Sequence, residues 1–370
     1  MRSPDRIQLK GFKSIHEMDL KLRPLNVLIG ANGAGKTNFI AAFELLNQIV
    51  EQNLQFFVAK SGGADALLHY GQKETGEISL RLHFGVNGYE AALAPSTHDT
   101  LIFARESCWF RGEGYTRPFE IEFNTRPSEI EFGRGQKETQ LHEHLEEKIV
   151  PYVLDGLRSW KVYHFHDTSA SAKIKKTGDI GDNAALRPDA SNLAAFLYLL
   201  REAHPKHYRL IIETIRLAAP FFDDFILQPT PANRNKIKLE WREQNSDAYF
   251  DASSLSDGTL RYICLTTLLL QPTLPSTILI DEPELGLHPY AITLLASMLH
   301  GAATKTQVIV STQSVTLVNQ FSPQDIIIVD REDGQSKFKR LNTRRLRQWL
   351  EEYGLGELWE KNILGGRPRR

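Results

Sequence analysis

The sequence predicts an α/β fold: a mixed core sheet with an antiparallel meander and an inserted helical lobe. Three observations support this. A glycine-rich loop joins an apolar strand to a helix within residues 25–46, and a second apolar strand at 277–280 ends in two acidic residues. Residues 76–123 repeatedly alternate polar and apolar side chains, which is typical of antiparallel strands. Strands that alternate with helices at both ends, split by an insertion, indicate an α/β core.

The composition is that of a globular protein. The chain has 370 residues, 41% of them hydrophobic and 24% charged. Its formal net charge of −1 gives no global basic field for nucleic acid, but this value does not exclude local basic patches. Cys108 and Cys264 lie far apart without metal-ligand spacing, so we expect a reducing, cytoplasmic location. We expect no membrane partner, because no apolar run approaches the roughly 20 residues of a membrane span.

The remaining elements follow from local patterns. Two alternating runs at 6–10 and 18–22 predict a hairpin ahead of the strand at 25–29. The polar stretch 124–140 predicts an exposed loop. Further strands are expected at 77–84, 89–93, 100–104, 119–123, 160–165, 307–311, 326–329 and 338–341, and a hairpin of 225–228 with 236–241. Further helices are expected at 38–46, 140–158, 191–203, 207–217, 260–270, 290–300, 344–353 and 358–361.

Residues 30–37, the phosphate loop, match the pattern G-x-x-x-x-G-K-[ST]. Glycines let backbone N–H groups turn toward phosphate oxygens, and the helix N-terminus adds partial positive charge. Lys36 is predicted to reach the β- and γ-phosphates of ATP, and the Thr37 hydroxyl to bind Mg²⁺. A glycine-rich turn without a ligand is the minor alternative. The predicted nucleotide contacts are Gly30, Asn32, Gly33, Ala34, Gly35, Lys36, Thr37 and Asn38.

Asp281 and Glu282, the acidic strand end, follow the apolar strand 277–280. Ligands of open α/β sheets gather at the carboxyl ends of strands. Asp281 is predicted to hold Mg²⁺, directly or through water, and Glu282 to polarise the attacking water as general base. The alternative is a helix N-cap, which Pro283 favours. On this motif alone the two interpretations weigh equally, and the upstream phosphate loop favours catalysis.

Residues 253–259, the signature segment, precede the helix expected at 260–270. Ser256 suits a simple N-cap and Asp257 a first helical turn. The functional interpretation is that the Ser256 hydroxyl, the Gly258 backbone and the helix N-terminus bind a γ-phosphate.

Together these segments resemble the ABC-type ATPase heads of the SMC and RecF class. Within that class they are similar to the predicted bacterial AAA-type ATPases and to the ATPase half of the OLD-family proteins. The resemblance implies ATP-dependent head-to-tail homodimers, with each ATP between the phosphate loop of one subunit and the Ser256 signature of the other. It implies a nucleotide-binding lobe of residues 1–168 and 276–370 and a helical lobe of 169–275. The likeness lies in residues 11–14, 30–38, 62–68, 163–168, 254–259, 280–289, 311–314, 355–359 and 365–368.

The resemblance also places several single residues. Phe12 and Lys13 would border the adenine. Gln313 stands where these heads usually carry a histidine, and its amide cannot take up a proton. Either hydrolysis is slow, or Gln313 only senses the γ-phosphate, or it is a plain polar residue at a strand end. His164 and His166, with neighbouring Asp167, occupy the Q-loop position, where a structural or lobe-coupling role is favoured over a metal site.

The expected function is an ATPase switch that controls a separately encoded effector, such as a nuclease in phage defence or DNA repair. The chain has no long heptad arms, and we expect no Toprim nuclease domain after Ser311 within these 370 residues. The alternative is a RecF-like DNA-binding ATPase, and an ABC transporter subunit is a distant third. The candidate contacts to DNA phosphates are the basic residues Lys173, Lys175, Lys176, Arg234, Lys236, Arg367, Arg369 and Arg370.

Overall fold

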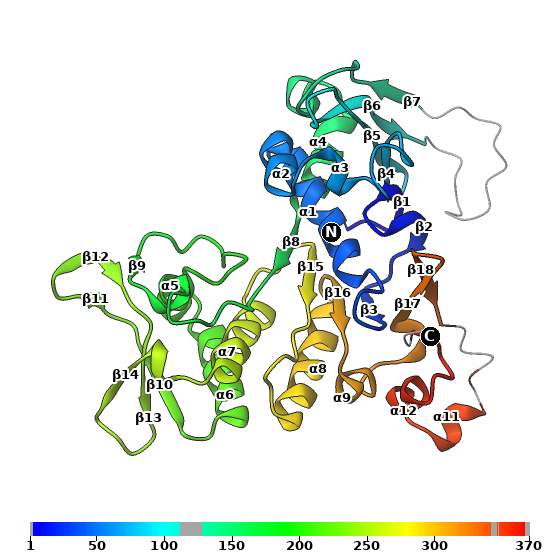
Figure 1. The fold of residues 1–370 in the computed structure, drawn as a ribbon. Coiled ribbons are helices and arrows are strands. Elements are labelled where there is room, and N and C mark those ends of the chain that lie inside the picture. The colour runs from blue at the N-terminus through cyan, green and yellow to red at the C-terminus, as the bar shows by residue number, and fades with distance from the viewer. Residues whose placement is uncertain (1–2, 112–127, 342–345, 347, 367–370) are drawn as a thin grey trace. The chain divides into compact units, whose positions relative to one another are not determined.

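The computed structural model describes residues 3–111, 128–341, 346 and 348–366 (Figure 1). The chain divides into two compact units. Unit one comprises residues 1–160, 323–349 and 361–370, and unit two comprises 161–322 and 350–360. The lobe boundaries at 169 and 275 stay a prediction. Among the described residues, no helix combines the length and apolar character needed to cross a bilayer.

Unit one contains an antiparallel sheet in the order β2-β1-β4-β5-β6-β7, here called the meander sheet. Arg6 pairs with Lys21 and Ile78 with Leu93, so the predicted hairpin and meander are confirmed. The strand expected at 119–123 lies outside the described residues. The strands are β1 (Arg6–Phe12), β2 (Ile15–Lys21), β4 (Ile78–Phe84), β5 (Asn87–Pro95), β6 (Leu101–Phe110) and β7 (Ser128–Glu131).

One strand and one helix of unit one differ from expectation. β7 extends the meander inside the stretch expected as a loop, where its polar side chains suit an edge strand. The helix expected over 140–158 is regular only in α4 (Ile149–Arg158). The buried Glu106 carboxylate accepts hydrogen bonds from the Thr139 hydroxyl and the Gln140 N–H, and this ties the start of that stretch to the meander sheet.

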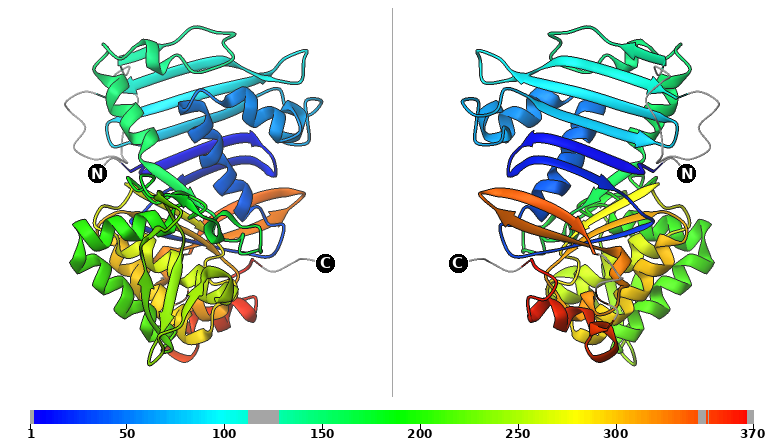
Figure 2. Two further views of the ribbon diagram at one scale, coloured as in Figure 1. Left: turned by 90° about the vertical axis from the view of Figure 1, so that its left-hand side faces the viewer. Right: turned by 90° about the vertical axis from the view of Figure 1, so that its right-hand side faces the viewer.

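Helices cover one face of the meander sheet. α1 (Lys36–Val50) and α4 lie on the same face, and α4 packs against β5 and β6 (Figure 2). The apolar side of α1 packs into this layer, where the ring of Phe43 meets Trp160 edge-on at 5.5 Å between centroids. α2 (Leu54–Lys60) and α3 (Ala64–Leu67) follow α1.

Unit one also holds the strand that leads into the phosphate loop. β3 (Leu25–Ile29) runs parallel to β17 (Ile326–Glu332), and β17 pairs antiparallel with β18 (Gln335–Arg340). All five residues of β3 are buried, as expected for a parallel strand covered on both faces. The predicted order of strand, loop and helix is confirmed.

Unit two contains a parallel βαβ unit. β15 (Thr277–Asp281) and β16 (Gln307–Thr312) pair in register, and α8 (Pro289–Ala303) connects them. β8 (Trp160–Tyr163) flanks β15. α9 (Val315–Val318) follows β16 and contacts α12 (Leu355–Glu360). The helix expected at 344–353 falls partly outside the described residues; α11 (Trp349–Glu352) is its described part.

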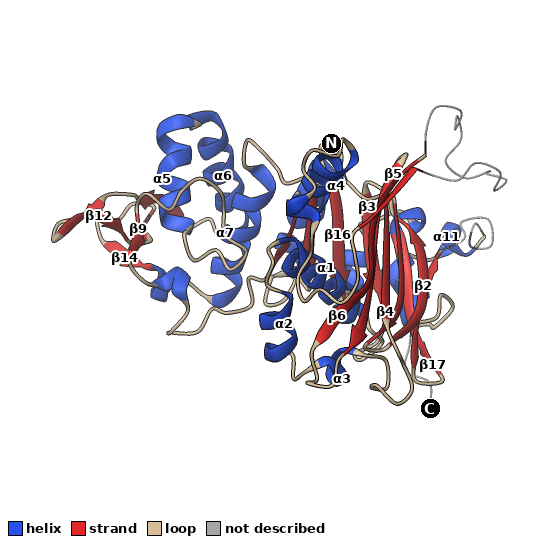
Figure 3. Ribbon diagram, turned by 90° about the horizontal axis from the view of Figure 1, so that it is seen from above, coloured by secondary structure: helices blue, strands red, loops and turns tan. Residues whose placement is uncertain are grey.

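The rest of unit two is a helical layer with two small sheets. α5 (Leu193–Ala203), α6 (Pro205–Ala218) and α7 (Asp257–Leu270) pack in succession (Figure 3). The predicted hairpin is confirmed at its base, where Phe225 pairs with Trp241, but its tip forms a separate sheet. The two sheets are β10 (Phe222–Ile226), β13 (Glu240–Glu243) and β14 (Tyr249–Asp251), and β11 (Pro229–Thr230), β12 (Asn233–Ile237) and β9 (Gly178–Asp179).

Candidate active site

Two glycines of the phosphate loop stand where no side chain fits. A Cβ on Gly30 would collide with the carbonyl oxygen of Val329 in β17, and one on Gly35 with the hydroxyl of Ser336 in β18. A different pair, Gly33 and Gly35, has φ angles of 76° and 114°. Residues with side chains rarely adopt this left-handed region. These glycines therefore let the loop close against β17 and β18.

Lys36 lies at the start of α1, with 5% of its surface exposed. Its Nζ donates to the carbonyl oxygens of Gly30 at 2.7 Å and Ala31 at 3.1 Å. The ammonium is thus held against the loop backbone by neutral acceptors. A phosphate would be a stronger partner, because its negative charge attracts the ammonium, whereas the carbonyl oxygens carry no net charge.

A chain of hydrogen bonds braces the phosphate loop. Asn38 Nδ2 donates to Ser14 Oγ at 2.7 Å, Ser14 donates to Ser336 Oγ at 2.6 Å, and Ser336 donates to the Ala34 carbonyl oxygen at 2.6 Å. Because Ser336 uses its hydroxyl proton for the bond to Ala34, it must accept in the bond with Ser14, and Ser14 is the donor there. Sequence reasoning missed Ser336 entirely and named Ser14 only as part of the family likeness. From β17, Arg331 adds a bond to the Gly33 carbonyl oxygen at 3.3 Å.

The two residues expected at the adenine differ in exposure. Phe12 is fully buried, whereas Lys13 is half-buried with φ 48°. Burial lowers the pKa of the Lys13 ammonium, with Glu44 acting against the shift. That Phe12 and Lys13 border the adenine stays a prediction.

The parallel register of β15 and β16 assembles the acidic strand end. Asp281 stands opposite Ser311, whose hydroxyl donates to Asp281 Oδ1. The Glu282 N–H donates to the Ser311 carbonyl oxygen at 2.9 Å. Glu282 has φ 43°, a strained conformation that clusters at functional sites. Its Oε1 accepts a hydrogen bond from Gln313 Nε2, so Asp281, Glu282 and Gln313 lie together.

Glu284 fastens the turn that carries Gln313. Its Oε1 accepts from the Thr312 hydroxyl at 2.6 Å, from the Gln313 N–H at 3.0 Å and from the Ser314 N–H at 3.2 Å. Its Oε2 is buried and has no hydrogen-bond partner among the described residues. Burial raises the pKa of this carboxyl in spite of these hydrogen bonds. Sequence reasoning quoted Glu284 within its motif but gave it no role.

Arg261 of α7 joins two loops of unit two. Its guanidinium donates to the carbonyl oxygens of Phe165 at 3.0 Å and His166 at 3.4 Å, and also to that of Leu285. His166 is close enough to Asp281 for that carboxylate to raise its pKa, but burial, the larger cause, lowers it. Among the described residues, no group of three or more His, Cys, Asp or Glu side chains could hold a metal alone. Sequence reasoning missed Arg261.

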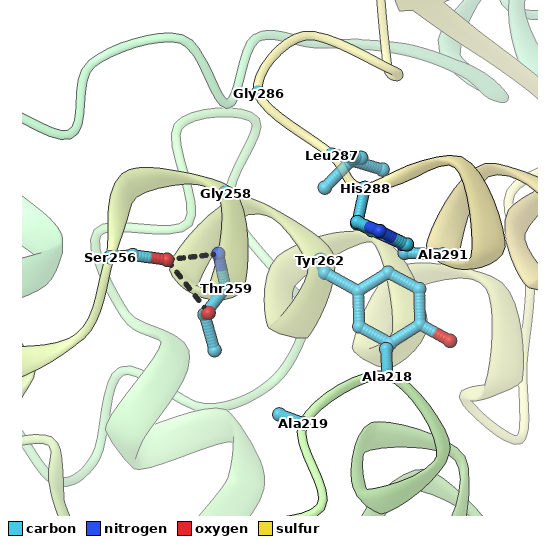
Figure 4. A pocket seen from close by; sticks show the side chains of 10 residues that line it. All are labelled: Ala218, Ala219, Ser256, Gly258, Thr259, Tyr262, Gly286, Leu287, His288 and Ala291. Atoms are coloured by element: carbon cyan, nitrogen blue, oxygen red, sulfur yellow. Dashed lines mark hydrogen bonds between the residues drawn. The ribbon is translucent and has the colours of Figure 1, made fainter.

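The signature segment caps α7 and borders a pocket. Ser256 Oγ accepts from the Thr259 N–H at 3.1 Å, so Ser256 is an N-cap. A Cβ on Gly258 would collide with the Gly286 carbonyl oxygen, which shows how closely α7 approaches the loop before α8. Together with Tyr262 and His288 these residues line a pocket of about 140 Å³ (Figure 4).

Residues 25–319 match the protein family described as "AAA domain, putative AbiEii toxin, Type IV TA system". The chain belongs to this family. The matched range of this AAA-domain protein contains the phosphate loop, the signature segment and the acidic strand end.

Solved structures show which fold this AAA-domain protein has. It resembles an Smc head bound to the C-winged helix domain of ScpA, with a TM-score of 0.61, 15% identity, and coverage of 93% of this chain and 99% of that one. It also resembles an Smc head with an extended coiled coil, bound to the C-terminal domain of ScpA, derived from Pyrococcus furiosus; the TM-score is 0.53 at 16% identity, over 95% and 99% of the two chains. The predicted mixed α/β fold is confirmed, and it is the fold of these Smc heads.

The AAA-domain protein also shares a short stretch with an OLD nuclease of Thermus scotoductus (strain ATCC 700910 / SA-01). The two are 40% identical over 52 residues, which is 14% of this chain and 10% of the nuclease. The match therefore spans about a tenth of that relative.

Proposed function

We propose that this AAA-domain protein hydrolyses ATP with Mg²⁺, dimerises head-to-tail around the nucleotide, and acts as a switch for a separately encoded effector. The observation that carries the proposal is the contact between Glu282 and Gln313 at the end of a core strand. The chain belongs to a family of AAA-domain proteins. In such a protein, the Glu282 carboxylate, held by Gln313 at the end of the strand, is suited to orient a water that attacks the nucleotide.

The phosphate loop suits a triphosphate. Its left-handed glycines free backbone N–H groups, α1 begins directly after them, and the Lys36 ammonium lies against the loop. The proposal assigns Mg²⁺ to the Thr37 hydroxyl and the Asp281 carboxylate, because Mg²⁺ prefers oxygen ligands. When bound, Mg²⁺ neutralises charge on the β- and γ-phosphates.

Glu282 serves as the general base in this proposal. Its Oε1 is held by Gln313, and its strained backbone is fixed by the hydrogen bond to Ser311. A held carboxylate keeps one rotamer and can accept the proton of a water that attacks the γ-phosphate. Gln313 orients that carboxylate or senses the γ-phosphate but cannot exchange a proton itself, so we expect slow hydrolysis.

The signature segment completes the site from the partner subunit. The Ser256 hydroxyl, the Gly258 backbone and the N-terminus of α7 supply donors and partial positive charge for the γ-phosphate of the partner's ATP. ATP then holds two copies together, and hydrolysis separates them.

Dimerisation tests the proposal. Glu282→Gln keeps the side-chain volume but removes the base, so this variant should elute as a dimer with ATP and as a monomer without it. Lys36→Ala should stay monomeric in both runs, because it lacks the charge that holds the phosphates. Size-exclusion chromatography reads out both results. Identical elution of Glu282→Gln with and without ATP would contradict the proposal.

A separate effector fits the known relatives. The family description names a toxin of a toxin–antitoxin system, and the matched OLD protein is a nuclease. Both Smc heads were solved with a bound domain of ScpA. We therefore propose that the switch acts in phage defence or DNA repair, in the cytoplasm, with the neighbouring gene as the first candidate for the effector.

The RecF-like DNA-binding alternative has less support. Four of the basic side chains named for it have partners within the chain, among them Lys176, whose Nζ donates to the Ala170 carbonyl oxygen at 3.0 Å. Lys175 Nζ donates to the Thr168 carbonyl oxygen at 2.6 Å, Lys173 lies 3.8 Å from an Asp189 oxygen, and Lys236 lies 3.7 Å from an Asp179 oxygen. The basic residues at 367–370 lie outside the described residues.

A further inference from the structure

One exposed aromatic ring in unit one has no assigned role. Tyr70 is 60% exposed and has φ 56°, and Gly71 after it has φ 79°. A bulky residue with positive φ is a genuine outlier, and such strain persists only where the surrounding structure over-determines it. The surrounding fold therefore keeps Tyr70 in a backbone conformation that a tyrosine disfavours, with its ring exposed to solvent.

The contacts that hold Tyr70 come from the turn at Lys13. The Lys13 N–H donates to the Leu67 carbonyl oxygen at 2.8 Å, and the His69 N–H to that of Gly11 at 3.0 Å. The His69 ring donates from Nδ1 to the Lys13 carbonyl oxygen at 2.6 Å. His69 itself is buried, and its ring packs on that of Tyr70 with centroids 4.5 Å apart. The position of Tyr70 is thus set by the Lys13 turn.

The same ring reaches the strands that brace the phosphate loop. A Cβ on Gly334, in the turn between β17 and β18, would collide with the Tyr70 hydroxyl. Two residues further along, Ser336 donates to the Ala34 carbonyl oxygen of the phosphate loop. Two residues of strand span roughly 7 Å. Tyr70 therefore lies beside both turns that hold the loop, the one at Lys13 and the one at Gly334.

We propose that Tyr70 stacks on the base of the nucleotide whose phosphates occupy the phosphate loop, beside the Lys13 ammonium that the family resemblance already places at the adenine. The inference rests on the proposed ATP binding and deepens it. Every nucleobase has a π-face that stacks on an aromatic side chain, and ring nitrogens of a purine accept hydrogen bonds from an ammonium group. Phe12 cannot offer its ring for this role because it is fully buried.

The test compares ATP with inorganic tripolyphosphate, which has the phosphates and no base. Tyr70→Asn removes the ring, and Asn tolerates the left-handed backbone at this position. Truncating an aromatic side chain that stacks on a base weakens the binding of that base by roughly 5- to 150-fold. Titration calorimetry should show a loss of that size for ATP and no change for tripolyphosphate. Tyr70→Trp, which keeps an aromatic face, should retain ATP binding.

Phe56 provides the matched control, because it is another exposed aromatic residue of unit one, 69% exposed in α2. Phe56→Ala should bind both ligands as the unchanged protein does. Equal weakening of ATP and tripolyphosphate in Tyr70→Asn would show that the ring acts through the loop, which overturns the inference. Unchanged ATP affinity would overturn it as well. If the unchanged protein binds neither ligand, the proposed ATP function fails first.

Discussion

At the scale of single residues, one carboxylate oxygen organises the end of β16. Glu284 Oε1 accepts hydrogen bonds from Thr312, Gln313 and Ser314, and this fixes the backbone from which the Gln313 amide reaches Glu282. In the proposed site, Glu284 would thus position Glu282 through Gln313.

Removing this acceptor should release Gln313. Glu284→Ala is expected to lower the kcat for ATP with little change in KM, because the phosphate loop is untouched. Leaving the donors unsatisfied should also reduce the free energy of unfolding by about 1–3 kcal/mol. Steady-state kinetics and denaturant unfolding measure the two effects. Glu284→Gln keeps an acceptor oxygen and should retain most of the activity.

A double variant separates positioning from general damage. If Glu284 acts through Gln313, then Glu284→Ala combined with Gln313→Ala should lose no more kcat than the stronger single variant. Losses that multiply would mean that Glu284 acts by another route.

At the scale of elements, α7 carries both the signature segment and the guanidinium that fastens the loops around it. Ser256 and Gly258 stand at its N-terminus, and one turn later Arg261 donates to carbonyl oxygens on either side. Movement of α7 would therefore be passed to the loop that follows the acidic strand end.

Arg261→Lys tests this connection. Lysine keeps the charge but has no planar fork, so it cannot reach Phe165 and Leu285 together. We expect a loss of about 1–3 kcal/mol in the free energy of unfolding, because a buried carbonyl is left unpaired. ATP-dependent dimerisation of Glu282→Gln should also weaken in this background. A variant as stable as the parent would show that the guanidinium contacts contribute nothing. Arg209→Lys, at an exposed arginine of α6, is the matched control.

At the scale of the whole molecule, the proposed site needs two chains. A variant defective in the phosphate loop and one defective in the signature segment should therefore complement each other. Mixing them creates dimers in which one of the two sites combines an intact loop with an intact signature.

Lys36→Ala and Ser256→Asp are suited to this experiment. Asp is as good an N-cap as Ser, so α7 should keep its start, while the added charge repels a γ-phosphate. Each variant alone should have almost no ATPase activity, and the mixture should regain a measurable part of it. Phosphate release assays read this out. A mixture as inactive as its components would place the whole site within one chain.

Local features of the fold could be predicted from the sequence, and distant contacts could not. The phosphate loop lies between a strand and a helix that are contiguous with it, and the acidic strand end follows its own apolar strand. Ser336 contacts Ala34 across 302 residues, and no pattern around either residue indicates the partner. The role of Glu284 depends on the register of β15 with β16. β7 was missed because an exposed edge strand needs few apolar residues.

The brace of Asn38, Ser14 and Ser336 has a consequence for how the protein is made. The glycine motif is complete once residue 37 has left the ribosome, yet the hydroxyl that fastens its loop belongs to β18, almost at the end of the chain. Contacts of such long sequence separation form late. A growing chain thus carries the full motif while the 302 residues that separate Ala34 from Ser336 are made, and we expect firm nucleotide binding only after β18 has formed.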